Sequence, residues 1–213
     1  MKSSITIACQ CGRQLTLETS GTKLPPDILC PDCHTSISFI EPLANSVAIR
    51  IFGRAWAELE REDFTLVIVF CAMAVECEMA GLFIKWKGVE LMATRTPTEA
   101  DKNVWAEQWR KWLGIAVKLN KVSELLTGKD FDSFLSHNAS LLKPLHEKYP
   151  NSQTYQSPKD FFQKELFDRR NKIVHLGAIN FQQVEAEMCF SMAVTLRQIL
   201  NEMDSQRNKR LQA

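Results

Sequence analysis

The chain has 213 residues, of which 45% are hydrophobic and 24% charged, and this ordinary globular composition excludes wholesale disorder and collagen-like repeats. Its 26 lysine and arginine residues are balanced by 25 aspartate and glutamate residues, which excludes a global field that would draw the chain to nucleic acid or to an anionic membrane. Any such binding must come from a local patch. The length suits a small appendage followed by a body of about 150 residues.

The N-terminal segment alternates between apolar and polar residues in short runs. This period of two predicts strands over residues 5–9, 14–19, 27–30 and 35–40. Strong breakers separate the runs, and Pro42 closes the segment. We therefore expect a small β module at the start of the chain.

Four of the seven cysteines form two tight pairs in this segment, Cys9 with Cys11 and Cys30 with Cys33. Each pair follows a predicted strand, so four thiolates can meet in the tetrahedral shell that zinc favours. A closed shell leaves no open position for substrate, so the predicted zinc is structural. A shell with His34 in place of one thiol, redox activity of Cys30 and Cys33, and four ordinary free cysteines remain alternatives.

Around these cysteines the sequence resembles zinc ribbons of the rubredoxin-knuckle type, over roughly residues 5 to 40. The first pair is spaced C-x-C and thus departs from the commonest C-x-x-C form. The resemblance implies a folded head that could bind a protein partner or help to grip RNA.

The cellular compartment is predicted from cysteine usage and from the first residues. Cys71, Cys77 and Cys189 lie inside helical patterns, which indicates buried thiols in a reducing compartment. The start of the chain has no apolar region typical of a secretory signal. We expect a cytoplasmic protein.

One stretch, from Leu66 to Ile84, could be mistaken for a membrane span. It is interrupted by Glu76 and Glu78, and carboxylates are unfavourable in lipid. We therefore expect a buried bundle helix and no membrane association.

Beyond residue 60 the periodicity changes to that of helices. The pattern predicts helices over residues 63–92, with Asp63 as N-cap, and over 102–126, 157–175 and 181–203, with a weaker helical segment at 130–145. Three tryptophans in the second helix, Trp105, Trp109 and Trp112, indicate core or a dimer interface in preference to a base-stacking platform. Short connections make antiparallel neighbours the default.

The segment near residue 170 combines Arg170, Asn171 and His175. A histidine can transfer a proton near neutral pH, and a guanidinium can hold a phosphate or stabilise a phosphorane. These two groups suffice for metal-free RNA cleavage by the 2′-hydroxyl. On a straight helix they lie about 140° apart, so they can address one ligand only near a helix end or across a dimer axis.

The run from Arg170 through Asn171 to His175 resembles the signature of HEPN domains (higher eukaryotes and prokaryotes nucleotide-binding): Arg, a polar residue, three more residues and His. More loosely, the resemblance covers residues 50–203 and includes the apolar helix that Glu76 interrupts. It implies a helical bundle that dimerises so that two motifs face one cleft, and metal-independent endoribonuclease activity in toxin, defence or RNA-processing systems. Some toxin members carry a modified tyrosine two residues after the histidine, where this chain has Gly177.

The predicted catalytic residues are therefore Arg170 and His175, oriented by Asn171 and by Glu76. A buried Glu76 needs a partner, and Arg170 or His175 is the natural candidate; a solvent-reaching glutamate is the alternative. Arg170 and His175 could equally be structural, in a non-catalytic adaptor or a nucleotide- or nucleic-acid-binding module.

The predicted fold class is a small β zinc ribbon followed by an all-α domain, a HEPN-like bundle of four or five helices. The predicted boundaries are residues 1–42 for the ribbon, 43–204 for the bundle and 205–213 for a polar tail. The predicted function is a metal-independent endoribonuclease that binds RNA and acts as a homodimer, with Zn2+ as its structural metal.

Overall fold

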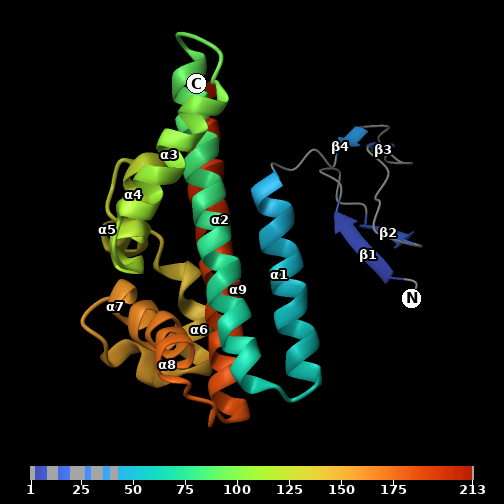
Figure 1. Ribbon diagram of the computed structural model, residues 1–213, viewed down its shortest axis with the longest axis vertical. Coiled ribbons are helices and arrows are strands. Elements are labelled where there is room, and N and C mark those ends of the chain that lie inside the picture. Colours follow the sequence, from blue (N-terminus) through green and yellow to red (C-terminus); the bar gives the residue numbers. More distant parts are fainter. Residues whose placement is uncertain (1–2, 9–13, 20–26, 30–35, 39–42, 213) are drawn as a thin grey trace. The chain divides into compact units, whose positions relative to one another are not determined.

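The computed structural model describes residues 3–8, 14–19, 27–29, 36–38 and 43–212, with the side chains of residues 47–211. The chain divides into two compact units, Met1–Pro42 and Leu43–Ala213. The second unit contains the long helices of the described residues (Figure 1).

The described parts of the first unit are two antiparallel strand pairs. Strand β1 (Ser3–Ala8) pairs with β2 (Gln14–Thr19), and β3 (Asp27–Leu29) pairs with β4 (Ser36–Ser38). Each pair forms its own two-stranded sheet. The four cysteines predicted to bind zinc lie outside the described residues.

The predicted fold class, a β zinc ribbon followed by a four- to five-helix bundle, is wrong. Residues 47–211 are all-helical without any strand, and no zinc ribbon is seen in the described parts of residues 1–42. Isolated two-stranded hairpins bury too little surface to define a stable module by themselves. The bundle also differs, because glycine and proline divide it into more and shorter helices than the periodicity predicts.

The described helices of the second unit include three long ones, the first two and the last, and a series of shorter ones between the second and the last. They are α1 (Leu43–Glu60), α2 (Phe64–Met92), α3 (Glu99–Lys111), α4 (Ile115–Thr127), α5 (Phe131–His137), α6 (Lys143–Lys148), α7 (Pro158–Phe162), α8 (Asp168–Leu176) and α9 (Gln183–Gln212). Short 3-10 turns, η1 (Ala139–Leu141) and η2 (Pro150–Thr154), flank α6, and a π-helical turn, η3 (Gln163–Phe167), joins α7 to α8.

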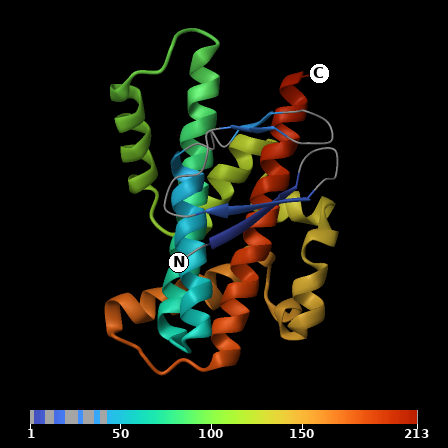
Figure 2. The ribbon, with the colours of Figure 1, turned by 90° about the vertical axis from the view of Figure 1, so that its right-hand side faces the viewer.

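Helix α2 is the centre of the unit, with α1 and α9 packed along it (Figure 2). The prediction that Asp63 is the N-cap of this helix is confirmed, because its side chain accepts a hydrogen bond from the Leu66 amide at 3.1 Å. By length and composition it is the one helix in the described residues that could cross a membrane, and core helices meet the same criterion. Its buried Glu78 accepts a hydrogen bond from Arg197 Nε at 2.6 Å.

Helix α1 was not predicted. Isoleucines and Gly53 lower its intrinsic helix propensity, so packing against α2 stabilises it. The residues that face the core follow helical spacing: Ala48, Phe52, Ala55 and Leu59.

The predicted helix over residues 102–126 is wrong, since it is two helices. Gly114 has φ +82°, which a helix cannot contain, and α4 begins directly after it. Trp109 and Trp112 nevertheless pack on Phe83, with ring centroids 5.8 and 4.9 Å away, and with Trp105 they are partly buried against the core.

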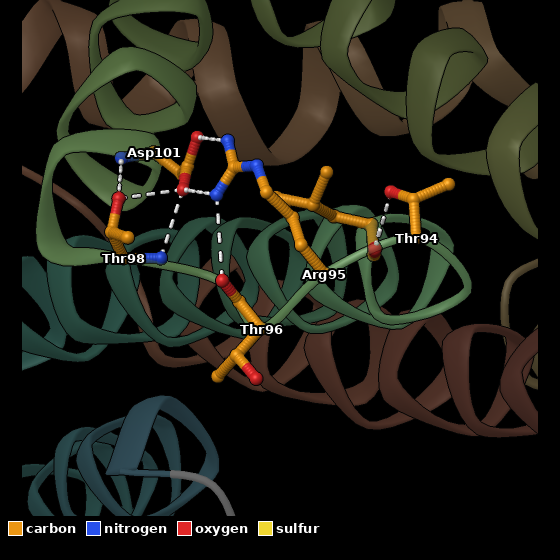
Figure 3. A network of polar contacts seen from close by, with 6 residues as sticks. Thr94, Arg95, Thr96, Thr98 and Asp101 are labelled. Carbon is orange, nitrogen blue, oxygen red and sulfur yellow. Dashed lines mark hydrogen bonds and ion pairs between the residues drawn. The ribbon is translucent and has the colours of Figure 1, made fainter.

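The corner between α2 and α3 is closed by a polar network. Arg95 binds both Asp101 oxygens, at 2.6 and 2.7 Å, and Asp101 forms a capping box with Thr98 (Figure 3). The hydrogen bonds from Arg95 hold the pKa of Asp101 well below its usual value. This network fixes where α3 begins.

The predicted polar tail is in fact helical, because α9 continues to Gln212. Arg207 contacts Glu90 at 3.2 Å, and Arg210 donates to the carbonyls of Leu126 and Thr127 at the end of α4. Partners on α2 and α4 thus stabilise a segment whose sequence alone suggests fraying.

Candidate functional site

The helix predicted over residues 157–175 is present as the continuous run of α7, η3 and α8, and α8 carries the Arg170 motif. At the start of this run, the Ser157 hydroxyl accepts a hydrogen bond from the Asp160 amide at 3.2 Å, and Pro158 occupies the first turn. Gly177 ends α8 with φ +65°, and its amide donates to the Ile173 carbonyl at 3.1 Å. In between, η3 inserts one π turn, a feature that is often found at functional sites.

Arg170 extends from α8 toward α2. Its Nη2 donates to Glu76 Oε2 at 3.2 Å, and its Nη1 donates to Asn171 Oδ1 at 2.9 Å. The prediction that Glu76 pairs with Arg170 or His175 is thereby confirmed for Arg170. The Nε of Arg170 is buried and has no acceptor in the described part of the chain, which is unusual for a buried donor.

Glu76 has a second cation as partner. Lys118 Nζ, from α4, lies 3.1 Å from Glu76 Oε1 and 5.0 Å from the centroid of the Trp109 ring. One carboxylate therefore serves two cations, so the cluster of Glu76, Lys118 and Arg170 carries one surplus positive charge. All three side chains are between 16% and 28% exposed, which leaves them within reach of a ligand.

The same carboxylate affects a neighbouring thiol. Burial, followed by the negative charge of Glu76, raises the pKa of Cys77. This thiol is therefore a poor nucleophile, and the cluster offers no activated cysteine.

His175 lies apart from this cluster. It is exposed in the last turn of α8, and its ring has no hydrogen bond within the described residues. Five helical positions separate it from Arg170, which turns it about 140° away around the axis. The structure thus brings together Arg170, Asn171 and Glu76 within one chain, and it does not bring His175 to them.

Exposed apolar side chains lie close to His175 in the sequence, at the end of α8. Val174 and Leu176 on α8 are 54% and 78% exposed, and Ile179 in the next connection is 71% exposed. The backbone there is held against α2, because the Thr65 hydroxyl donates to the Ile179 carbonyl at 3.1 Å. An exposed apolar patch of this kind is typical of an interaction site. We call Val174, Leu176 and Ile179 the α8-end patch.

The neighbouring Arg169 faces a different set of groups. It donates to Glu165 at 2.6 and 3.1 Å and also contacts Glu185 on α9. Burial acts to raise the pKa of Glu165, but hydrogen bonds from Tyr155 and Arg169 outweigh it and lower that pKa. This network anchors α8 to α9.

No cluster of three or more His, Cys, Asp or Glu side chains that could hold a metal occurs in the described residues. Cys71, Cys77 and Cys189 are free thiols. Cys9, Cys11, Cys30 and Cys33 lie outside the described residues, so zinc binding stays a prediction.

Comparison of the chain with protein-family models, with curated proteins and with solved structures finds no match. The geometry of the site must therefore be interpreted from its own residues. Lys118 is the site residue that the sequence did not predict, because it is 42 positions from Glu76 and belongs to no motif.

Proposed function

We propose that this protein is a metal-independent endoribonuclease of HEPN type that acts as a homodimer. The observation that supports it best is the surplus positive charge of the cluster around Arg170, on the same short helix as an exposed histidine. A cationic site with an available imidazole matches the needs of phosphate-ester cleavage.

In the proposed reaction, His175 takes the proton of the 2′-hydroxyl, and the 2′-oxygen attacks the adjacent phosphorus. The bond from phosphorus to the 5′-oxygen breaks, and that oxygen receives a proton from the second His175. The products are a 2′,3′-cyclic phosphate and a 5′-hydroxyl. Arg170 neutralises the charge that develops on the phosphorane, while Glu76 and Asn171 hold its guanidinium in place.

The homodimer is proposed because Arg170 and His175 face different directions on one helix. A two-fold axis beside the end of α8 would set the Arg170 of one protomer near the His175 of its partner. The α8-end patch supports this arrangement, since an isologous contact would bury the same apolar residues on both protomers.

We also propose that Cys9, Cys11, Cys30 and Cys33 bind one structural zinc ion. The stretch between the paired strands β1 and β2 contains the first two thiols, and that between β3 and β4 contains the other two. Four thiolates are a donor set suited to zinc. The expected zinc content of the purified chain is one per protomer and falls in Cys30→Ser; an unchanged content in that variant would contradict the assignment.

The test of the nuclease is cleavage of single-stranded RNA in the presence of EDTA, with identification of the product ends. His175→Ala should lower the rate by roughly 10²- to 10⁴-fold. His137→Ala is the matched control, because His137 is also exposed near a helix end and lies outside the motif. Full activity of His175→Ala, or 3′-hydroxyl products, would sink the proposal.

A non-catalytic nucleic-acid-binding module is the second candidate, since Glu76 and Asn171 already engage the Arg170 guanidinium while His175 lies apart. It predicts RNA binding without cleavage by the wild-type protein. Because His175 is exposed, its replacement should leave thermal stability unchanged under either function, so RNA cleavage decides between them.

A further inference from the structure

A cavity of about 350 Å³ lies between the turn after α6, the helix α7, the π turn η3 and α9. Aromatic and apolar side chains make up somewhat more than half of its lining residues, and polar side chains make up the rest. The residues that matter here are Tyr149, Tyr155, Phe161, Met188, Lys148 and Asn151. Such a pocket, mostly apolar with a few polar groups, is the usual form of a small-molecule site.

The aromatic walls are held in fixed orientations. The Tyr155 hydroxyl donates to Glu165, and its ring lies on Phe161 with centroids 5.0 Å apart. The Tyr149 hydroxyl lies 3.4 Å from Ser191 Oγ. These hydroxyl contacts restrict the rotation of both tyrosine rings, so less ordering is needed when a flat ligand ring packs on them.

The cation at the cavity, which lacks a carboxylate partner among the described residues, suits an anionic ligand. Glu165, the acidic residue of the lining, already accepts hydrogen bonds from Tyr155 and Arg169, so its oxygens are engaged within the protein. Lys148 stands exposed at the rim; its Nζ lies 3.4 Å from Ser191 Oγ and 5.3 Å from the Tyr149 ring centroid, and no carboxylate pairs with it in the described residues. An aromatic cage that binds an ammonium ion would need a negative charge at the position where Lys148 places a positive one.

Asn151 supplies the remaining element of recognition. It is exposed on η2, and its side-chain amide has no hydrogen-bond partner within the described part of the chain. An amide can donate to and accept from the edge of a base. The cavity therefore combines stacking faces, a hydrogen-bonding edge and a cation.

We propose that this cavity binds one nucleotide, with its base between Tyr149 and Tyr155 and its phosphate at Lys148. The volume of about 350 Å³ lies at the small end of the range of small-molecule sites. The nucleotide can be free or can belong to an RNA strand, and the second case rests on the proposed nuclease. Ten residues separate Glu165 from His175, about 15 Å along a helix, which a short RNA can span.

The experiment uses the full chain with His175→Ala, so that no RNA is cut. Titration calorimetry measures binding of AMP, GMP, CMP and UMP and, separately, of a short single-stranded RNA. Tyr149→Leu removes the stacking ring but keeps apolar bulk, and should weaken binding roughly tenfold. Lys148→Ala should weaken binding several-fold and reduce its salt dependence.

Two matched controls report on unspecific effects. Trp105→Leu removes a partly buried ring at a separate surface hollow, and Lys143→Ala removes an exposed lysine of α6 outside the cavity. Both should bind as the parent does. Lys148 is exposed, so its variant tests the cavity even if Tyr149→Leu proves unstable by circular dichroism.

Binding of a mononucleotide that the cavity variants weaken supports a free-nucleotide site. Binding of RNA alone, weakened by the same variants, supports a subsite for RNA. Absence of binding to all probes, or equal losses in the control variants, overturns the proposal. Cleavage is not part of the measurement, so a protein that binds here but cuts no RNA refutes the nuclease and leaves this inference standing.

Discussion

Arg169 and Arg170 are neighbours in the sequence, yet they stand in opposite electrostatic situations. Arg169 is shared between two carboxylates, Glu165 and Glu185, so its charge is more than compensated. Among the described residues Arg170 has one carboxylate partner, Glu76, which also binds Lys118, so a positive charge is left over. The difference separates an arginine that holds helices together from one that can meet an anion.

Exchange of each arginine for alanine is the strongest test of this comparison. Arg170→Ala should lower RNA cleavage by roughly 10²- to 10³-fold, because one stabilising group is lost in the transition state. Its stability should change little, since Glu76 keeps Lys118. Arg169→Ala should lower the free energy of unfolding by about 2 kcal/mol, because it leaves two carboxylates without their hydrogen-bonded cation.

Cleavage assays and denaturant unfolding of both variants measure these effects. The comparison fails if the two variants share one phenotype, either both inactive with native stability or both merely unstable.

The α8-end patch gives the next effect in size. Leu176→Asp would place two like charges in the proposed two-fold contact, and should weaken dimerisation by roughly 30-fold or more. Leu211→Asp is the control, since Leu211 is also an exposed apolar residue but lies near the end of α9. Analytical ultracentrifugation measures the association. A monomeric wild type, or equal effects of both substitutions, would argue against the dimer.

Lys118 tests whether the surplus charge near Arg170 matters by itself. Lys118→Ala should reduce the rate of cleavage about tenfold. At an effective dielectric of about 20, loss of one nearby positive charge raises the activation free energy by ~1–2 kcal/mol. Lys118→Arg should restore most of the rate, since it keeps the charge. No recovery in the arginine variant would show that the lysine acts through packing on Trp109 and not through its charge.

The smallest expected effect concerns acid stability on the Arg169 side. The folded pKa of Glu165 is lowered, so the unfolded chain takes up its proton first as the pH falls. The stabilisation is present at neutral pH, declines below the usual value of about 4.5 and is lost as the pH passes the folded pKa. Glu165→Gln should remove this pH dependence of the free energy of unfolding, which amounts to about 1 kcal/mol or less after solvent screening.

Urea unfolding at a series of pH values measures this change. Glu147→Gln is the control, since Glu147 is exposed on α6 and its ion pair with Lys143 is long, at 3.8 Å. An identical pH profile for wild type and Glu165→Gln would contradict the network around Arg169.

The sequence predicted the features that depend on local chemistry. The predicted helix starts at Asp63 and at residue 157, and the predicted helix end at residue 175, agree with the structure to within one or two residues, because capping acts within one turn. Where several weak local signals compete, prediction failed. Helix α1 lacks strong propensity, and the helix over residues 102–126 concealed the left-handed Gly114.

The site divides in the same way. The sequence by itself identified Arg170, Asn171 and His175 as a motif and required a partner for Glu76, since a buried carboxylate needs one. The spacing of Arg170 and His175 on a helix also indicated that His175 lies about 140° away from Arg170. Only the tertiary structure decided that Arg170 is the partner of Glu76 and that Lys118 joins it. These contacts join positions 94 and 42 residues apart, so they depend on how α2, α4 and α8 pack.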